Sequence, residues 1–145
     1  MKAQSRLRVR YAETDAMGIV YYANYLVWME VARVDMLREA GLDYRQVEAS
    51  GIAFPVVEVQ CTYRRPARFD DLVVISAAVT ETASRRLTIS YEIHKEEGGT
   101  LVLLGDGYTR HACVNAEGRP IALPEPVMAV LKRLMSGDPT GSMLV

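Results

Sequence analysis

The chain has 145 residues, half of them hydrophobic, and this length is enough for one domain with a sizeable core. Its 17 Lys and Arg residues against 18 Asp and Glu residues give a formal net charge of -1. No basic field is therefore available to attract nucleic acid or an anionic membrane, and we expect neither as a partner. An anionic ligand would have to be bound by a local cluster of basic residues.

The N-terminus and the cysteines indicate the compartment. Residues 1–8 lack the apolar core of a signal peptide, and the apolar run from Gly18 to Met29 is too short to span a bilayer. Cys61 and Cys113 are isolated and do not form a secreted disulfide framework, so we expect both to be reduced and buried. These features predict a soluble cytoplasmic protein.

The first predicted element is a strand, because Leu7, Val9 and Tyr11 alternate with three arginines. The spacing then becomes helical over residues 22–40, and Gly41 is well placed to end the helix. Because the first half of this helix is apolar almost all round, we expect that half to be buried. Two apolar stripes run along the helix: Tyr25, Trp28, Met29, Ala32 and Met36, and then Val27, Val31 and Val34.

Four more strands follow a polar connection over residues 42–51. In the first of them Val57, Val59, Cys61 and Tyr63 alternate with polar residues. Turn residues separate the next three, which are predicted at 72–80, 86–95 and 101–114, and such short turns make consecutive strands antiparallel neighbours. A last helix is predicted over 127–135, after two prolines, and residues 136–145 are expected to form a flexible tail.

This order predicts one α+β domain over residues 1–135. An antiparallel sheet of about five strands wraps around one long central helix, and a short helix follows the sheet. A sheet of this kind leaves one face and an edge free, which favours association with another copy of the chain. We therefore expect a homo-oligomer.

The chemistry is expected at Asp15, in the stretch that leads into the apolar helix. A helix start offers backbone N–H groups without intrahelical partners, and a carboxylate beside such groups suits acyl transfer. The alternative role for Asp15 is structural, as the acceptor of an Asx turn or a cap. His94 and His111 lie in predicted strands, and the chain has no Ser-centred elbow, Cys–His pair or metal-ligand spacing. We expect neither a metal nor another cofactor.

The pattern Thr14-Asp15-x-x-Gly18-x-Val20-Tyr21-x-x-Asn24-Tyr25, followed by a buried helix and four strands, resembles the 4-hydroxybenzoyl-CoA thioesterase family of hotdog folds. The resemblance extends from Arg6 to Val127. It implies an enzyme that hydrolyses an acyl-CoA or acyl-carrier-protein thioester. It also implies an assembly of dimers, commonly paired into tetramers, with active sites at the subunit interface.

The resemblance implies roles for residues of the loop and helix. Asp15 matches the catalytic carboxylate, as nucleophile or general base, and Tyr22 matches the position whose backbone N–H polarises the thioester carbonyl. Branches of the family often have His where this chain has Tyr22; a backbone donor survives that change, but a role for an imidazole does not. The residue types themselves leave two alternatives at two further positions: Gly18 either brings the loop close to substrate or forms a simple turn, and Tyr25 either lines an acyl pocket or packs in the core.

Further substrate contacts follow from the same resemblance. Phe54 and Pro55 match a segment that lies beside the thioester from the partner subunit, and Phe54 favours an apolar acyl group. By their chemistry alone, two clusters are able to bind CoA phosphates: the arginines of residues 64–68, and Arg85 with Arg86. The resemblance favours Arg85 and Arg86, which match basic residues at the nucleotide end of the substrate.

Two other functions stay open at this point: a noncatalytic acyl-CoA-binding module, and a carrier-protein thioesterase of polyketide or lipid synthesis.

Overall fold

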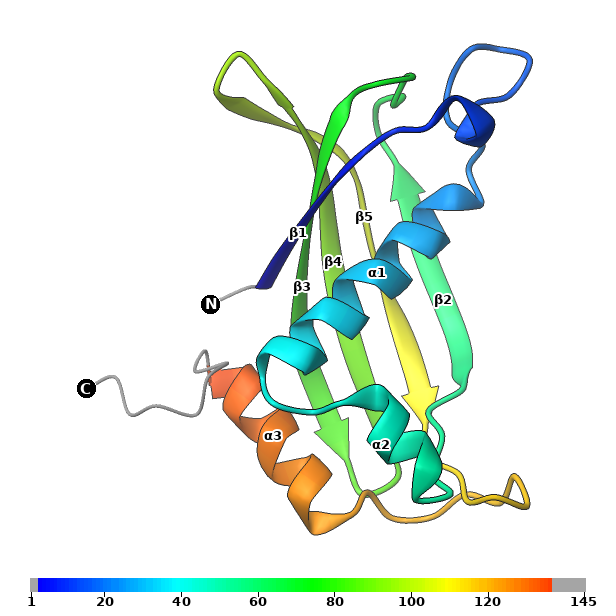
Figure 1. Ribbon diagram of the computed structural model, residues 1–145, viewed down its shortest axis with the longest axis vertical. Helices are drawn as coiled ribbons and strands as arrows, with labels where there is room; N and C mark the ends of the chain where they lie inside the picture. The colour runs from blue at the N-terminus through cyan, green and yellow to red at the C-terminus, as the bar shows by residue number, and fades with distance from the viewer. Residues whose placement is uncertain (1–2, 137–145) are drawn as a thin grey trace.

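The structure is a computed structural model that describes residues 3–136. A five-stranded antiparallel sheet, in the order β1-β3-β4-β5-β2, curves around one long helix, α1 (Figure 1). The strands are β1 (Ala3–Arg8), β2 (Val56–Tyr63), β3 (Leu72–Ala83), β4 (Arg86–Glu97) and β5 (Thr100–Ala112), and the helices are α1 (Asn24–Glu39), α2 (Tyr44–Ala49) and α3 (Glu125–Ser136). This arrangement confirms the α+β class and the predicted hotdog fold. The expected tail lies, apart from Ser136, outside the described residues.

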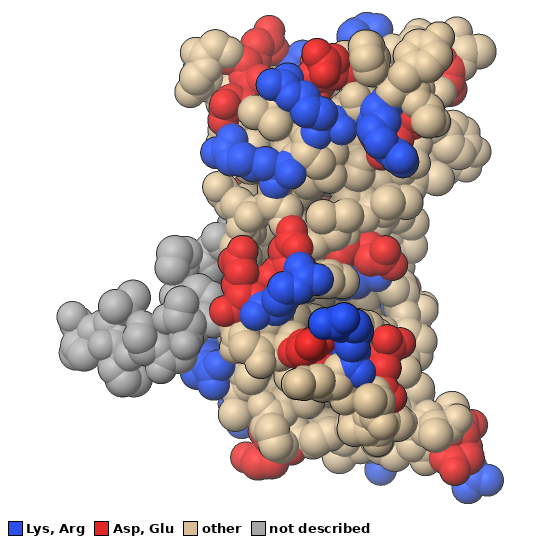
Figure 2. Space-filling view, viewed as in Figure 1, with Lys and Arg blue, Asp and Glu red and all other residues tan. Residues whose placement is uncertain are grey.

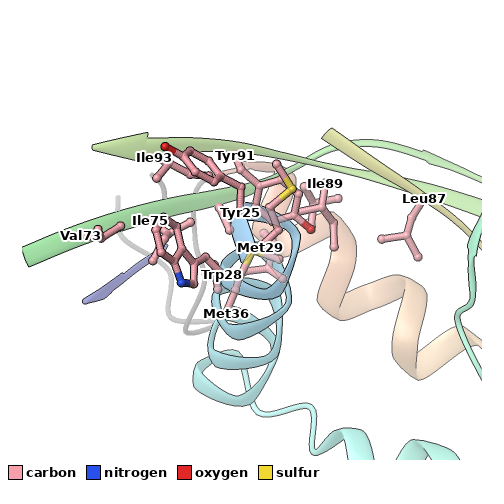
Figure 3. Packing of buried hydrophobic residues seen from close by; sticks show 14 of the residues in the cluster. Tyr25, Trp28, Met29, Met36, Val73, Ile75, Leu87, Ile89, Tyr91 and Ile93 are labelled. Atoms are coloured by element: carbon pink, nitrogen blue, oxygen red, sulfur yellow. The ribbon is translucent and has the colours of Figure 1, made fainter. Parts of the chain in front are cut away.

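One apolar cluster fills the space between α1 and the sheet. Figure 3 shows Trp28, Met29 and Met36 of the helix beside the apolar side chains of β3 and β4. The predicted stripe is confirmed, since all five of its members are buried. Burying one large apolar side chain contributes about 1.5–3 kcal/mol, so this stripe fixes how α1 lies on the sheet.

Two members of the second stripe of α1, Val27 and Val31, are exposed, and Val34 is half-buried, so the expectation that the first half of this helix is buried all round was wrong. Leu26, Val27 and Val31 have exposed fractions of 36%, 48% and 36%. The reason is geometric: the sheet covers the side of the helix that carries the first stripe, and these three side chains lie outside the core cluster. This uncovered stripe is therefore available for contact with another molecule.

Two segments differ from the predicted elements. Tyr11 does not extend the first strand. β1 ends at Arg8, which pairs with the first residue of β3, Leu72, and Tyr11 is an exposed residue at the start of a 3-10 turn. The supposed polar connection over residues 42–51 contains α2, whose start is capped by the Asp43 carboxylate accepting from the Arg45 N–H at 2.9 Å. This short helix has one buried residue, which is too weak a pattern to be recognised in the sequence.

The two cysteines also differ from each other. Cys113 is buried, as expected, but Cys61 is only half-buried because it lies on the edge strand β2. Both are free thiols.

No helix among the described residues is both long and apolar enough to cross a membrane. Figure 2 shows positive and negative side chains interspersed over the visible face, without a large area of one sign. This distribution agrees with the net charge of the sequence.

A directed hydrogen-bond chain crosses the sheet at His111. Its Nδ1 lies 3.0 Å from the Phe54 carbonyl oxygen, which can only accept, so this nitrogen carries the proton. In the neutral ring Nε2 then accepts from the Thr109 hydroxyl at 2.8 Å, and Thr109 Oγ1 accepts from Tyr91 at 2.7 Å. Burial lowers the pKa of His111, and the charge of Arg33 adds to this, against the opposing effect of the Phe54 hydrogen bond.

This lowered pKa predicts a loss of stability in acid. Between the folded-state pKa of His111 and its ordinary value of about 6.5, the unfolded chain binds more protons, so stability falls as the pH falls. Urea unfolding at pH 7 and pH 5 should show a larger loss for the wild type than for His111→Gln, by at most about 1.4 kcal/mol per pH unit. Equal losses in the two proteins would contradict this assignment.

Candidate active site

A closed loop carries Asp15 to the start of α1. Thr14 pairs with Val20 as an isolated antiparallel bridge, and inside it the Asp15 N–H donates to the Ile19 carbonyl at 2.9 Å. The turn closes where the Gly18 N–H donates to the Asp15 carbonyl at 2.9 Å, with Gly18 at φ 78°. Glycine adopts this left-handed conformation at little cost, so Gly18 does form the turn that was one of its two predicted roles. Its approach to substrate stays a prediction.

The Asp15 side chain is half-buried and makes the Asx turn that the sequence offered as its structural role. Its Oδ1 accepts from the Met17 N–H at 2.9 Å. Its Oδ2 has no partner among residues 3–136. One carboxyl oxygen thus orients the group, while the other is free to act on a ligand.

An open cleft of about 420 Å³ brings Asp15 together with Tyr22 and Tyr25. Tyr63 and Arg64, from the far end of β2 and just beyond it, line the same cleft. Among the described residues around this cleft, Asp15 is the only one with a carboxylate. Two of the residues predicted to work with Asp15 are therefore beside it.

Backbone donors are available at the entry to α1. The Tyr21 N–H donates to the Glu13 carbonyl at 2.8 Å, and the Asn24 N–H donates to the Tyr21 carbonyl at 2.9 Å. Between them, the N–H groups of Tyr22 and Ala23 have no acceptor within the described part of the chain. Unpaired N–H groups at a helix start are suited to bind a carbonyl oxygen that gains negative charge.

Two phenols that line the cleft, those of Tyr25 and Tyr63, are neutral near pH 7. Burial raises the pKa of Tyr25 to about 12, and burial also raises the pKa of Tyr63. Tyr63 donates to the Tyr22 carbonyl at 3.0 Å, which ties β2 to the helix start. Neither phenol can serve as a base near neutral pH, so Asp15 is the available basic group.

The remaining predicted contacts lie elsewhere in the same chain. Phe54 lines a smaller cavity of about 100 Å³ beside the C-terminal half of α1, and Pro55 pairs through its carbonyl with Ala112. Arg85 and Arg86 lie at the β3–β4 turn, at the opposite end of the sheet from the loop that precedes α1 (Figure 1). The whole length of β2 separates these segments from Asp15, so one chain alone does not bring them together.

The sequence interpretation missed Glu13 and Tyr63 as residues of this site. Glu13 is buried at 5% exposure, although it stands among the exposed loop residues Tyr11 and Ala12. One partner of its carboxylate, the Arg10 N–H, is local, but the partner within the core, Trp28, is 15 residues further along the chain, so the local sequence does not show that Glu13 is buried. For Tyr63 the sequence did hold a usable signal, because the alternation along β2 places its side chain on the same face of the strand as Cys61.

No group of three or more His, Cys, Asp and Glu side chains among the described residues is arranged to hold a metal ion.

The sequence matches the thioesterase-like superfamily over residues 9–131. It is 34% identical over 120 residues to a putative acyl-CoA thioesterase, YneP of Bacillus subtilis, covering 82% of this chain and 85% of that protein. It is 33% identical over 128 residues to the acyl-CoA thioester hydrolase YbgC of Escherichia coli, covering 88% and 93% of the two.

Solved structures agree with this match. A hypothetical protein from Thermus thermophilus is 45% identical, with a TM-score of 0.85, covering 91% of this chain and 98% of that one. A mutant 4-hydroxybenzoyl-CoA thioesterase in complex with 4-hydroxybenzoyl-CoA is 21% identical, with a TM-score of 0.81, covering 88% of this chain and 96% of that one, and at this identity it supports the fold alone. The fold and the family resemblance expected from the sequence are confirmed.

Proposed function

Because the chain belongs to the thioesterase-like superfamily and is a thioester hydrolase, we propose that it hydrolyses acyl-CoA at the Asp15 cleft. The observation that carries this proposal is the pairing of Asp15, whose Oδ2 is free, with the unpaired N–H groups at the start of α1. A base or nucleophile and an oxyanion donor are the two groups that acyl transfer requires.

The Asp15 carboxylate starts the reaction by one of two routes. It attacks the thioester carbon, forming a mixed anhydride and releasing the thiolate of CoA, and water then cleaves the anhydride. Alternatively, it takes a proton from a water molecule, which attacks the same carbon and expels the thiolate. Both routes place negative charge on the carbonyl oxygen, where the Tyr22 N–H stabilises it. After a single turnover in ¹⁸O-labelled water, label in the Asp15 side chain would identify the anhydride route, because water that attacks the Asp15 carbonyl of the anhydride leaves its oxygen there, whereas the general-base route never labels Asp15.

A second copy of the chain completes the site. β2 is an edge strand, and its apolar residues Val57 and Val59 are exposed, as is the stripe of Val27 and Val31 on α1. Such an edge binds another strand readily. If two β2 strands pair antiparallel about a twofold axis, the start of one strand lies opposite the end of the other.

This pairing assigns positions to the substrate contacts that one chain keeps apart. The Phe54-Pro55 segment of one chain lies beside Tyr63 of the other, at the rim of the Asp15 cleft. Arg85 and Arg86 come with it, because β4 begins beside the His111 region that binds the Phe54 carbonyl. The proposed active site is therefore shared by two subunits, with CoA phosphates held by this arginine pair.

The arginine assignment predicts a change in KM that depends on phosphate. Arg85→Gln/Arg86→Gln should raise KM for acyl-CoA about tenfold, through lost charge-assisted hydrogen bonds, with little change in kcat. KM for the same acyl group on N-acetylcysteamine, which has no phosphate, should stay unchanged. The matched variant Arg65→Gln/Arg68→Gln tests the other cluster, and a rise in KM for that variant alone would overturn the assignment to Arg85 and Arg86.

The direct test of the function is release of free thiol from acyl-CoA by the purified protein. We expect turnover above the buffer rate for at least one acyl group in a panel of straight-chain, branched and aromatic substrates. Binding of these substrates without release of thiol would instead identify a noncatalytic acyl-CoA-binding module.

A further inference from the structure

Glu13 is a buried acidic residue that has no part in the chemistry above. Its Oε1 accepts from the Arg10 N–H at 2.8 Å, and its Oε2 accepts from the Trp28 indole N–H at 3.0 Å. Backbone N–H and indole N–H groups can only donate, so both carboxyl oxygens of Glu13 are acceptors. The Arg10 guanidinium, 3.8 Å from Oε1, adds a positive charge beside the carboxylate.

The backbone of Glu13 holds the other end of the same loop. Its carbonyl accepts from the Tyr21 N–H at 2.8 Å and from the Asn24 side-chain amide at 2.9 Å. One residue thus connects the beginning of the loop, its end and the first turns of α1. The connection is rigid, because Trp28 is 1% exposed within the core.

The hydrogen bonds of Glu13 to Arg10, Trp28, Tyr21 and Asn24 form a frame, and both groups of the proposed mechanism, the Asp15 carboxylate and the Tyr22 N–H, lie next to it in the chain. Asp15 follows Glu13 by two residues, and Tyr22 follows Tyr21 directly. The hydrogen bond from Tyr21 to the Glu13 carbonyl therefore sets where the free Tyr22 N–H lies relative to the Asp15 carboxylate. A shift of the frame changes the distance between these two groups.

We propose that Glu13 is a positioning residue, whose buried carboxylate holds Asp15 and the Tyr22 N–H at the separation that thioester hydrolysis requires; this inference rests on the proposed function. It does not touch the substrate. Its effect is on the chemical step, since a misplacement of about 1 Å in a reacting group costs about 100-fold in rate.

The test replaces one acceptor of Glu13 by a donor. Glu13→Gln has the same size, but its amide NH₂ faces an N–H donor of Arg10 or Trp28, so one hydrogen bond becomes a contact between two donors. We expect kcat to fall at least about tenfold and KM for acyl-CoA to stay within about twofold. The measurement is steady-state kinetics on protein whose folding is confirmed by circular dichroism.

A second substitution provides the rescue. Trp28→Phe removes the indole N–H and keeps a smaller aromatic ring, so in Glu13→Gln/Trp28→Phe the amide NH₂ no longer faces a donor there. We expect the double variant to have a higher kcat than Glu13→Gln. A purely structural role predicts the reverse, because two defects in the core would add.

The control is Ser5→Ala, which removes a partly buried hydrogen bond, from Ser5 Oγ to Asp35 Oδ2 at 2.7 Å, between β1 and α1. It should lower the stability without changing kcat. The inference is overturned if Glu13→Gln keeps the wild-type kcat, or if Ser5→Ala loses as much. Asp15→Asn in the same assay distinguishes failure of the proposed function from failure of the Glu13 proposal. Full activity of Asp15→Asn would overturn the proposed function. An inactive Asp15→Asn together with a Glu13→Gln of normal kcat would overturn only the role of Glu13.

Discussion

Replacing Asp15 with asparagine is expected to lower kcat at least about 100-fold, the scale of catalysis by a positioned acid or base. Asparagine has the size of aspartate, and its amide oxygen still accepts the Met17 N–H that now binds Oδ1. The loop should therefore keep its shape, while the group that attacks the thioester or activates water is lost. The measurement is kcat for thiol release, with KM followed in parallel.

Asp43→Asn is the control for this substitution. Asp43 accepts from the N–H two residues ahead at 2.9 Å, as Asp15 does, but it caps α2 and does not line the cleft. We expect Asp43→Asn to keep the wild-type kcat. If both variants were fully active across many acyl-CoA substrates, the carboxylate of Asp15 would be only the acceptor of its turn.

The second large effect is expected at Gly107, where β5 passes β2 too closely for any side chain. A Cβ atom built on Gly107 would lie 1.9 Å from the Gln60 carbonyl oxygen and 2.9 Å from the Cys61 Cα. Both of these are backbone atoms, so Gly107→Ala must push the strands apart and break their hydrogen bonds. We expect a loss of at least about 3 kcal/mol in the free energy of unfolding, the upper range for overpacking.

Gly105→Ala gives the graded comparison for this prediction. At Gly105 the contact is less severe, 2.7 Å to the Thr62 carbonyl oxygen. Urea unfolding should therefore rank the two variants, with Gly107→Ala the less stable. Because β2 carries Tyr63 to the cleft, we also expect Gly107→Ala to lose activity. A Gly107→Ala protein as stable as the wild type would show that β2 and β5 are not held at this separation.

Periodicity made the core predictable. The buried stripe of α1 follows from apolar residues at helical spacing, and the strands follow from alternation between turn residues. The same rules failed where a periodic pattern of apolar residues extends past the strand or sheet that it would pack against. Tyr11 keeps the period of β1, but β3 offers no residue to pair with it. Val27 and Val31 look like core residues because the sequence cannot show that the sheet covers only one side of their helix.

The candidate site was predictable only in part for a related reason. Asp15, Tyr22 and Tyr25 lie close together along the chain, so their motif can be recognised in the sequence. Glu13 accepts a hydrogen bond from Trp28, which is 15 residues away along the chain, and Tyr63 donates one to Tyr22, which is 41 residues away. Contacts between such distant segments leave no local pattern in the sequence. Phe54 and Arg85 need a second chain to reach the cleft, and their place in the site stays a prediction.

The central claim is that the Asp15 cleft hydrolyses acyl-CoA thioesters. Its most direct test compares the wild type with Asp15→Asn by the rate of free thiol release over a panel of straight-chain, branched and aromatic acyl-CoA substrates, with both proteins shown to be folded. We predict turnover by the wild type on at least one substrate and a loss of at least about 100-fold in Asp15→Asn. Thiol release at the buffer rate by the wild type, or at equal rates by the two proteins, would contradict the claim.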